Sequence, residues 1–111
     1  MNDIKAVKAI KLTPGEKYQR LLSYESGTFG VKSGHVILNS GEKIGLHSTR
    51  EREEVIIVLK GEGEAAVGQE KILKIEKNSV LYIPPETEHD INNTGIGILE
   101  YVYVTSVAQN A

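Results

Sequence analysis

Two clusters of polar side chains, far apart in the sequence, contain residue types that bind divalent metal ions. His47 and Glu54 lie in the first cluster, within residues 41–61, and His89 ends the second cluster, residues 82–89. The chain has no cysteine, so a metal site would need imidazole nitrogens and carboxylate oxygens. Two histidines and one carboxylate would leave coordination positions open for a small molecule.

The three side chains can meet only if strand pairing brings the clusters together. Val55 to Leu59 is a run of five apolar residues rich in β-branched side chains, and it is apolar on both faces. Such a run is either a strand covered on both sides or part of a buried helix, and its length and the glycine at 61 favour the strand. Neighbouring residues of a strand face opposite ways, so only one of Glu53 and Glu54 can point inward.

The rest of the chain is divided into short segments by turn residues. We expect strand pieces at 28–31, 35–38, 64–67, 71–75, 80–83, 89–92 and 98–104, with Gly34 at a bulge or bend. Residues 10–12 give a weak strand signal, and residues 18–24 fit either a short strand or one helical turn. Since no stretch shows a convincing helical period over ten residues, the sequence predicts an all-β sandwich or barrel.

Length and composition narrow the class of protein. The 111 residues are enough for one domain, 1–111, for which we expect a core at about 28–107 and an N-terminal strand segment at 1–27. Thirteen Lys and Arg balance fifteen Asp and Glu without a basic stripe, which argues against a nucleic-acid partner. The longest apolar run is too short to span a membrane and the N-terminus lacks a signal-peptide pattern, so we expect a cytoplasmic protein.

The spacing of the two clusters resembles that of the cupin superfamily, whose members are small jelly-roll β-barrels, also described as double-stranded β-helices. The first cupin motif is Gly, five residues, His-x-His, three or four residues, Glu, six residues and Gly. The second is Gly, five residues, Pro-x-Gly, two residues, His, three residues and Asn. The matching positions are Gly41, His47, Glu54 and Gly61 in the first motif, and Pro84, His89 and Asn93 in the second.

The resemblance implies an all-β, single-domain cupin fold and selects one metal-ligand set. The six-residue gap to the closing glycine favours Glu54 over Glu53 as the inward carboxylate. The implied cofactor is one divalent metal ion held by His47, Glu54 and His89, with zinc, iron, manganese, nickel and cobalt all compatible. The alternative is a polar pocket without metal, which some cupins have.

Three positions depart from the motifs. Thr49 stands where the first motif has its second histidine, so the usual shell of three His and one Glu would be reduced, with a water or a weak Thr49 hydroxyl completing it. Asn78 and Glu86 stand at the two glycine positions of the second motif, and we expect these changes to alter only turn geometry, since Asn tolerates a positive φ and Glu does not favour it.

Four further residues are candidate pocket residues. Tyr82, Tyr101 and Tyr103 lie on predicted strands and are expected in the core or the pocket wall, where one could supply an acid or a hydrogen-bond donor. His35 lies outside both motifs, and a surface or hydrogen-bonded role is the first interpretation, with a pocket role as the second.

Two arginines lie between the ligands of the first motif. Arg50 and Arg52 are interpreted as solvated loop residues, and the alternative is that they bind an anionic substrate.

Three functions are compatible with this sequence. The first is a metal-dependent enzyme on a small molecule, of the dioxygenase or sugar isomerase and epimerase type, as the resemblance implies. The others are a binding module for a sugar or anion without turnover, and a metal-free structural domain. Because an open β-sandwich has strand edges to cover and small cupins commonly pair, we also expect a homodimer, joined through residues 98–107 or the N-terminal strand.

Overall fold

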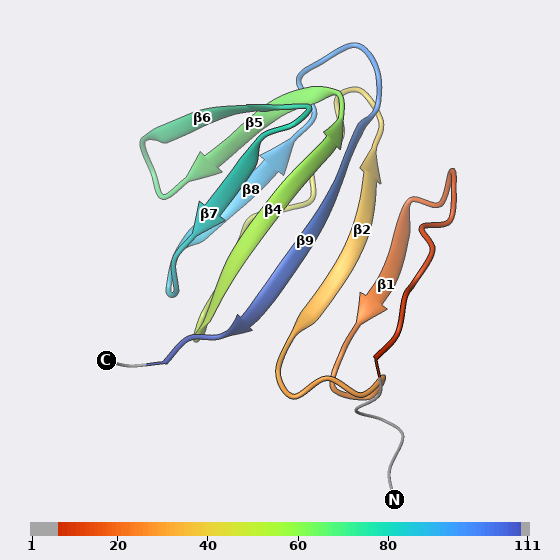
Figure 1. Ribbon diagram of the computed structural model, residues 1–111. Coiled ribbons are helices and arrows are strands. Elements are labelled where there is room, and N and C mark those ends of the chain that lie inside the picture. Colours follow the sequence, from red (N-terminus) through yellow and green to blue (C-terminus); the bar gives the residue numbers. More distant parts are fainter. Residues whose placement is uncertain (1–6, 110–111) are drawn as a thin grey trace, which may run out of the picture.

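The computed structural model describes residues 7–109, which form nine strands and no helix (Figure 1). The strands are β1 (Tyr18–Leu22), β2 (Lys32–Leu38), β3 (His47–Ser48), β4 (Arg52–Lys60), β5 (Glu62–Val67), β6 (Lys71–Glu76), β7 (Val80–Ile83), β8 (Glu88–Asn92) and β9 (Leu99–Val107). Within the described residues, therefore, nothing is helical, and no helix is available to cross a membrane.

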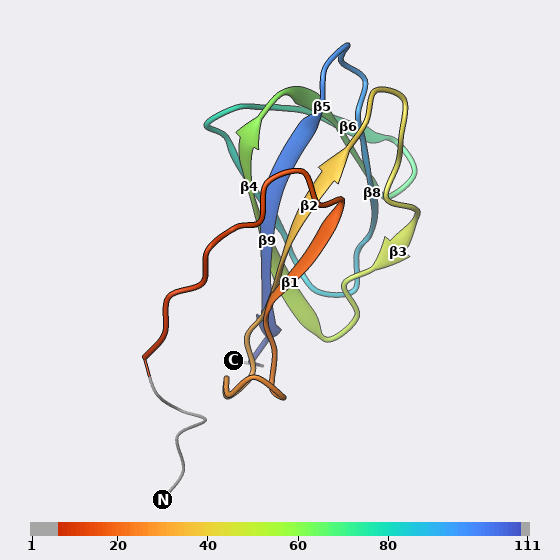
Figure 2. The ribbon, with the colours of Figure 1, turned by 90° about the vertical axis from the view of Figure 1, so that its right-hand side faces the viewer.

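The strands form two antiparallel sheets that face each other. One sheet has the order β1-β2-β9-β4-β7 and the other has the order β3-β8-β5-β6. Figure 2 shows β3 and β8 in a different layer from β1, β2 and β9. The chain passes repeatedly between the sheets, so strands distant in sequence become neighbours, as when β9 pairs with both β2 and β4. This is the all-β arrangement that the sequence predicts, and it is a double-stranded β-helix.

The core lies between the two sheets and is built by alternation along the strands. On β4, Ile56 and Val58 are each 1% exposed and face inward, whereas Ile57 is 38% exposed and faces outward. Eleven buried residues form the core cluster: Val36, Leu38, Ile56, Val58, Ala65, Ile75, Leu81, Ile83, Ile91, Leu99 and Tyr101. The prediction that 55–59 is a strand is confirmed, but among the described residues only its inward face is buried under the opposite sheet.

Two of the predicted strand pieces are wrong. Residues 28–31 form turns and coil before β2, and residues 10–12 are not in a strand. Gly34 pairs with Tyr103 of β9 in regular register, but on its other side the register of β1 shifts between Arg20 and Leu22, opposite Gly34 and Ser33, so the predicted irregularity is found on β1. A Cβ at Gly34 would lie 2.6 Å from the Tyr103 ring, so the glycine makes room for that side chain. Residues 18–22 form a strand, which resolves the alternative between strand and helical turn.

The two replaced glycines of the second motif keep a glycine-like backbone. Asn78 has φ 71° and Glu86 has φ 54°, both in the left-handed region. Both turns thus adopt a positive φ without glycine, and the expectation that the replacements alter only turn geometry stays a prediction. At Glu86 the backbone N–H donates to the Arg50 carbonyl at 2.7 Å, which fixes the conformation despite its strain.

We predict that Glu86→Gly stabilises the protein. A side chain in the left-handed region costs about 1 kcal/mol, and only part of that gain is lost to the greater freedom of glycine in the unfolded chain. The expected net gain is about 0.5 kcal/mol, or roughly 2–4 °C in the melting temperature. Asn78→Gly is the matched control and should change the melting temperature less, because Asn tolerates a positive φ. Equal shifts in the two variants would contradict the strain at residue 86.

Candidate metal centre

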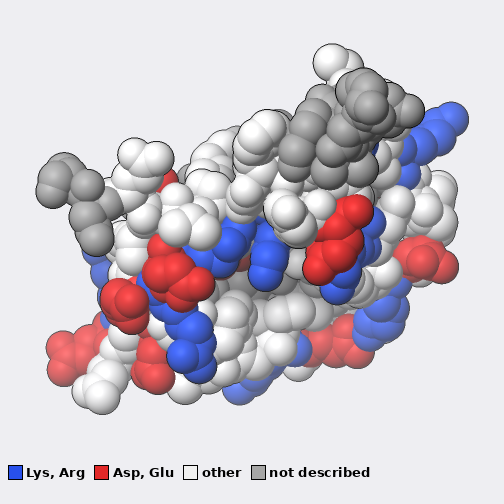
Figure 3. Space-filling model, turned by 90° about the horizontal axis from the view of Figure 1, so that it is seen from below, with Lys and Arg blue, Asp and Glu red and all other residues white. Residues whose placement is uncertain are grey.

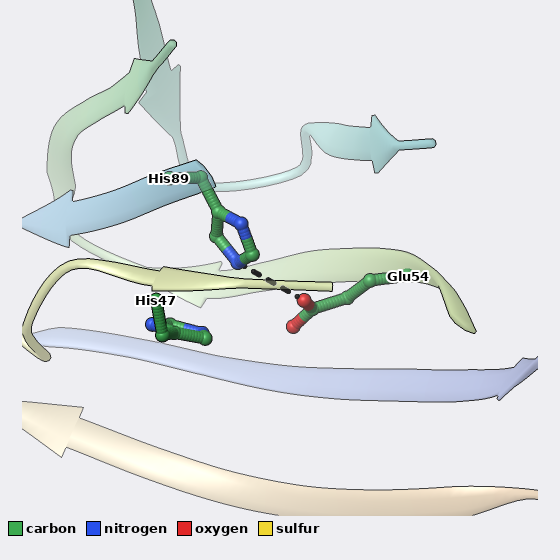
Figure 4. A group of neighbouring side chains, drawn as sticks. All are labelled: His47, Glu54 and His89. Atoms are coloured by element: carbon green, nitrogen blue, oxygen red, sulfur yellow. Dashed lines mark ion pairs between the residues drawn. The ribbon is translucent and has the colours of Figure 1, made fainter. Parts of the chain in front are cut away.

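Strand pairing brings the two predicted clusters together. β3 and β8 are neighbours in one sheet, and their register places His47 directly opposite His89. The two imidazole rings have centroids 4.3 Å apart and are tilted by 58°. Glu54 enters from β4 of the opposite sheet, and one ligand atom from each residue lies within 4.8 Å of the others (Figure 4).

Both histidines are held by the same kind of hydrogen bond. Nδ1 of His47 lies 2.7 Å from the Gly45 carbonyl oxygen, and Nδ1 of His89 lies 3.0 Å from the Thr87 carbonyl oxygen. A carbonyl oxygen can only accept, so each Nδ1 carries the proton and donates it. In a neutral ring this leaves the lone pair on Nε2, the tautomer that a metal-binding histidine needs.

His89 is the most deeply buried of the three side chains. It is 1% exposed, Glu54 is 8% exposed, and His47 is exposed. The Nε2 atom of His89 lies 3.2 Å from Oε1 of Glu54, but it lacks the alignment of a hydrogen bond and has no hydrogen-bond partner among the described residues. A buried imidazole nitrogen without a hydrogen bond is costly, and a cation between these atoms would remove that cost.

Protonation of His89 competes with metal binding. Burial alone lowers the pKa of His89, but the contact with Glu54, the hydrogen bond to the Thr87 carbonyl and the charges of Glu54 and Asp90 outweigh it, so the net shift of the pKa is upward. The raised pKa means that His89 holds a proton more firmly than a free imidazole does. A metal ion would have to displace that proton.

Taken together, the three residues fit a divalent cation. Two neutral Nε2 donors and one carboxylate are the donor types that zinc and the neighbouring transition metals accept. The carbonyls of Gly45 and Thr87 orient the rings in advance, as partners of metal ligands do. Since three protein ligands leave coordination positions free, the arrangement is open to a further ligand from the pocket.

Thr49 is bound to the backbone of the second motif. Its hydroxyl donates to the Pro84 carbonyl at 2.7 Å and accepts from the Thr87 N–H at 3.1 Å. Thr49 is 7% exposed and lines the pocket. At this position the threonine therefore joins the two motif loops, and weak ligation by its hydroxyl remains a prediction.

The candidate centre opens into a pocket of about 320 Å³ between the sheets. Tyr101 and Tyr103 lie in its wall on β9, and Tyr18 joins them from β1, with a 2.7 Å hydrogen bond between the hydroxyls of Tyr18 and Tyr103. Burial, followed by the charge of Glu54, raises the pKa of Tyr101. Burial, followed by the hydrogen bond with Tyr18, raises the pKa of Tyr103. Both phenols thus stay protonated at neutral pH.

Tyr82 does not belong to the core or the pocket wall, which corrects the sequence interpretation. On β7, Leu81 and Ile83 point inward, and alternation turns Tyr82 outward, where it is 55% exposed. Its hydroxyl donates to Oε1 of Glu53 at 2.8 Å, and this hydrogen bond raises the pKa of Tyr82. Glu53 is therefore the outward carboxylate of β4 and Glu54 is the inward one.

His35 lies on the other side of the five-stranded sheet from the candidate centre. It is 0% exposed, and its Nε2 atom lies 2.6 Å from Oε2 of Glu100 on the neighbouring β9. A surface position is contradicted by the burial of His35, and a role in this pocket is contradicted because His35 lines a different pocket, together with residues 12–15. The hydrogen-bonded interpretation is confirmed.

Arg52 is the pocket residue that sequence analysis placed among solvated loop residues. It is the first residue of β4 and lines the pocket together with Glu54. A signal for this was present in the sequence, because residues two apart on a strand share a face and Arg52 precedes Glu54 by two. Arg50, in the turn before β4, is exposed and does not line the pocket.

The fold and the site together define a small β-barrel protein with a candidate metal centre of two histidines and one glutamate. Residues 34–105 match the model of the cupin domain, and the chain belongs to the cupin family. One fold can host many unrelated functions, so membership of a family does not fix the reaction.

Three similar proteins illustrate the range of resemblance. An uncharacterised protein of Methanocaldococcus jannaschii is 37% identical over 68 residues, a match that covers 60% of this chain and 54% of that protein. An RmlC-like cupin from the same organism, with a double-stranded β-helix fold, has a TM-score of 0.79 at 21% identity and covers 92% of each chain. A predicted oxalate decarboxylase from Thermotoga maritima has a TM-score of 0.75 at 27% identity, over 82% of this chain and 79% of that one.

Proposed function

We propose that this protein is a metal-dependent enzyme acting on a small molecule, with His47, Glu54 and His89 holding one divalent cation. The observation that carries the proposal is the shared orientation of the two imidazoles, each of which donates Nδ1–H to a backbone carbonyl and leaves Nε2 toward the other ligands. Two histidines in an unrelated surface cluster would not be expected to share this tautomer and orientation. The donor set suits zinc, iron, manganese, nickel or cobalt.

The pocket contains possible hydrogen-bond and proton donors in addition to the proposed cation. A bound cation would act as a Lewis acid on an oxygen atom of the small molecule. Tyr101 and Tyr103 remain protonated because their pKa values are raised, so they can donate a hydrogen bond or a proton to that molecule. Oxygenation and the isomerisation or epimerisation of sugars are the reaction types that we propose.

The test begins with the metal content of protein purified without added metal. We expect about one divalent ion per chain, and turnover of a keto-sugar, a phenolic compound, a β-diketone or a small dicarboxylic acid that stops on chelation and returns with one metal. The dicarboxylic acid is included because the Thermotoga maritima relative is named a predicted oxalate decarboxylase. Absence of metal from the purified protein, together with failure to take up any of the five metals, would overturn the proposal.

A binding module without turnover is the second outcome that the same experiment can give. In that case one of these compounds raises the melting temperature of the metal-loaded protein but is recovered unchanged. A metal-free domain would give neither metal uptake nor stabilisation.

A further inference from the structure

We propose that Arg52 makes the pocket selective for small carboxylic acids, an inference that rests on the proposed metal site and deepens it. The guanidinium of Arg52 is anchored by groups of the protein. Nε donates to the Thr105 hydroxyl at 2.9 Å, and Nη2 donates to the Gly30 carbonyl and to the Thr105 carbonyl, the latter at 3.3 Å. These bonds fix the plane of the group at the pocket wall.

The anchored guanidinium keeps unused hydrogen-bond donors. Nη1 makes no hydrogen bond within residues 7–109, and no carboxylate of those residues lies within ion-pair distance of Arg52. Arg52 is half-buried and lines the pocket, so its charge is partly removed from water without a counter-ion. A half-buried charge of this kind gains most from a ligand of opposite charge.

The charges in the pocket also favour a carboxylate ligand. Glu54 is the pocket's carboxylate, and a divalent cation bound there would outweigh its single negative charge. Arg52 adds a positive charge, so the loaded pocket is net positive. Apart from His47 and His89, the rest of the wall consists of apolar side chains, hydroxyls and tyrosines. A molecule with a carboxylate for Arg52 and a second oxygen for the cation matches both positive groups, and about 320 Å³ limits it to a small one. The face of the molecule drawn in Figure 3 has acidic and basic side chains mixed around uncharged ones, without a broad patch of one charge.

The test compares pyruvate with its uncharged amide, pyruvamide, as probes of the metal-loaded protein by calorimetry. We expect the wild-type protein to bind pyruvate at least about tenfold more tightly than pyruvamide, as a charge-assisted hydrogen bond predicts. Arg52→Gln should weaken pyruvate binding about 10- to 100-fold and leave pyruvamide binding nearly unchanged. Arg52→Lys keeps the charge without the planar fork and should give an intermediate loss. Arg50→Gln is the matched control and should bind both probes as the wild type does.

Metal analysis of each variant separates this proposal from the proposed function. Arg52→Gln should still hold one metal per chain, because Arg52 is not one of the three ligands. If the wild type holds no metal, the metal proposal fails, and the selectivity is then judged on the metal-free protein with the same probes. Equal affinities for pyruvate and pyruvamide, binding of neither probe at 10 mM, or an Arg50→Gln loss equal to that of Arg52→Gln would overturn the role of Arg52.

Discussion

Replacing His47 and His89 together with alanine is expected to abolish stoichiometric metal binding. Loss of a residue that merely orients a metal ligand lowers affinity about 10- to 100-fold, so loss of two of three ligands should lower it by more than about 100-fold. Metal content after dialysis against a weak chelator, measured by elemental analysis, should fall from about one ion per chain to near zero. Circular dichroism would show whether the strands persist. Full metal occupancy in the double variant would place the metal elsewhere.

Two neighbouring carboxylates on β4 provide a matched control for this experiment. Glu54→Gln should reduce metal content strongly, because Glu54 faces His89 across 3.2 Å. Glu53→Gln removes the same charge one residue away but faces outward toward Tyr82, so the metal content should not change. His35→Gln tests the third histidine, which pairs with Glu100 on the outer face, and should also keep the metal.

Gly61→Ala is expected to give the largest loss of stability among single substitutions of the motif residues. A Cβ at this position would lie 2.0 Å from the Ile98 carbonyl oxygen and 3.0 Å from Cα of Leu99, both backbone atoms. The backbone φ of 86° adds the strain of the left-handed region. Relief requires β5 to move away from the start of β9, so we expect a loss of at least about 3 kcal/mol in the free energy of unfolding in urea.

Gly68→Ala separates the clash from the strain. Gly68 has a φ of 64° in the hairpin between β5 and β6, but a Cβ there would have no heavy atom within 4 Å. The expected loss is about 1 kcal/mol, from backbone strain alone. If both variants lose the same stability, the requirement for Gly61 would be conformational rather than steric.

Much of the fold could be predicted from local patterns. Alternation and turn residues located most strands, because side chains that face a core must be apolar at every second position. The failure at 28–31 and the reason for a glycine at 34 both involve segments that are distant in the sequence. A strand needs a partner at the right distance, and a glycine can serve a neighbouring side chain, here Tyr103, that lies 69 positions away in the sequence. Local sequence contains neither fact.

The sequence by itself determined which residue types could bind a metal, their spacing, and the resemblance to the cupin family. It could not assign tautomers, because the carbonyls of Gly45 and Thr87 are positioned by the bends before His47 and His89. Nor could it decide which face of β4 or β7 is inward, since the face of a strand depends on how it pairs and which side another sheet covers. Once Glu54 is known to face inward, alternation places Arg52 on the same face. The tertiary structure decides the tautomers and the inward faces, because it brings β3, β4 and β8, which are separated along the chain, within a few ångströms of one another.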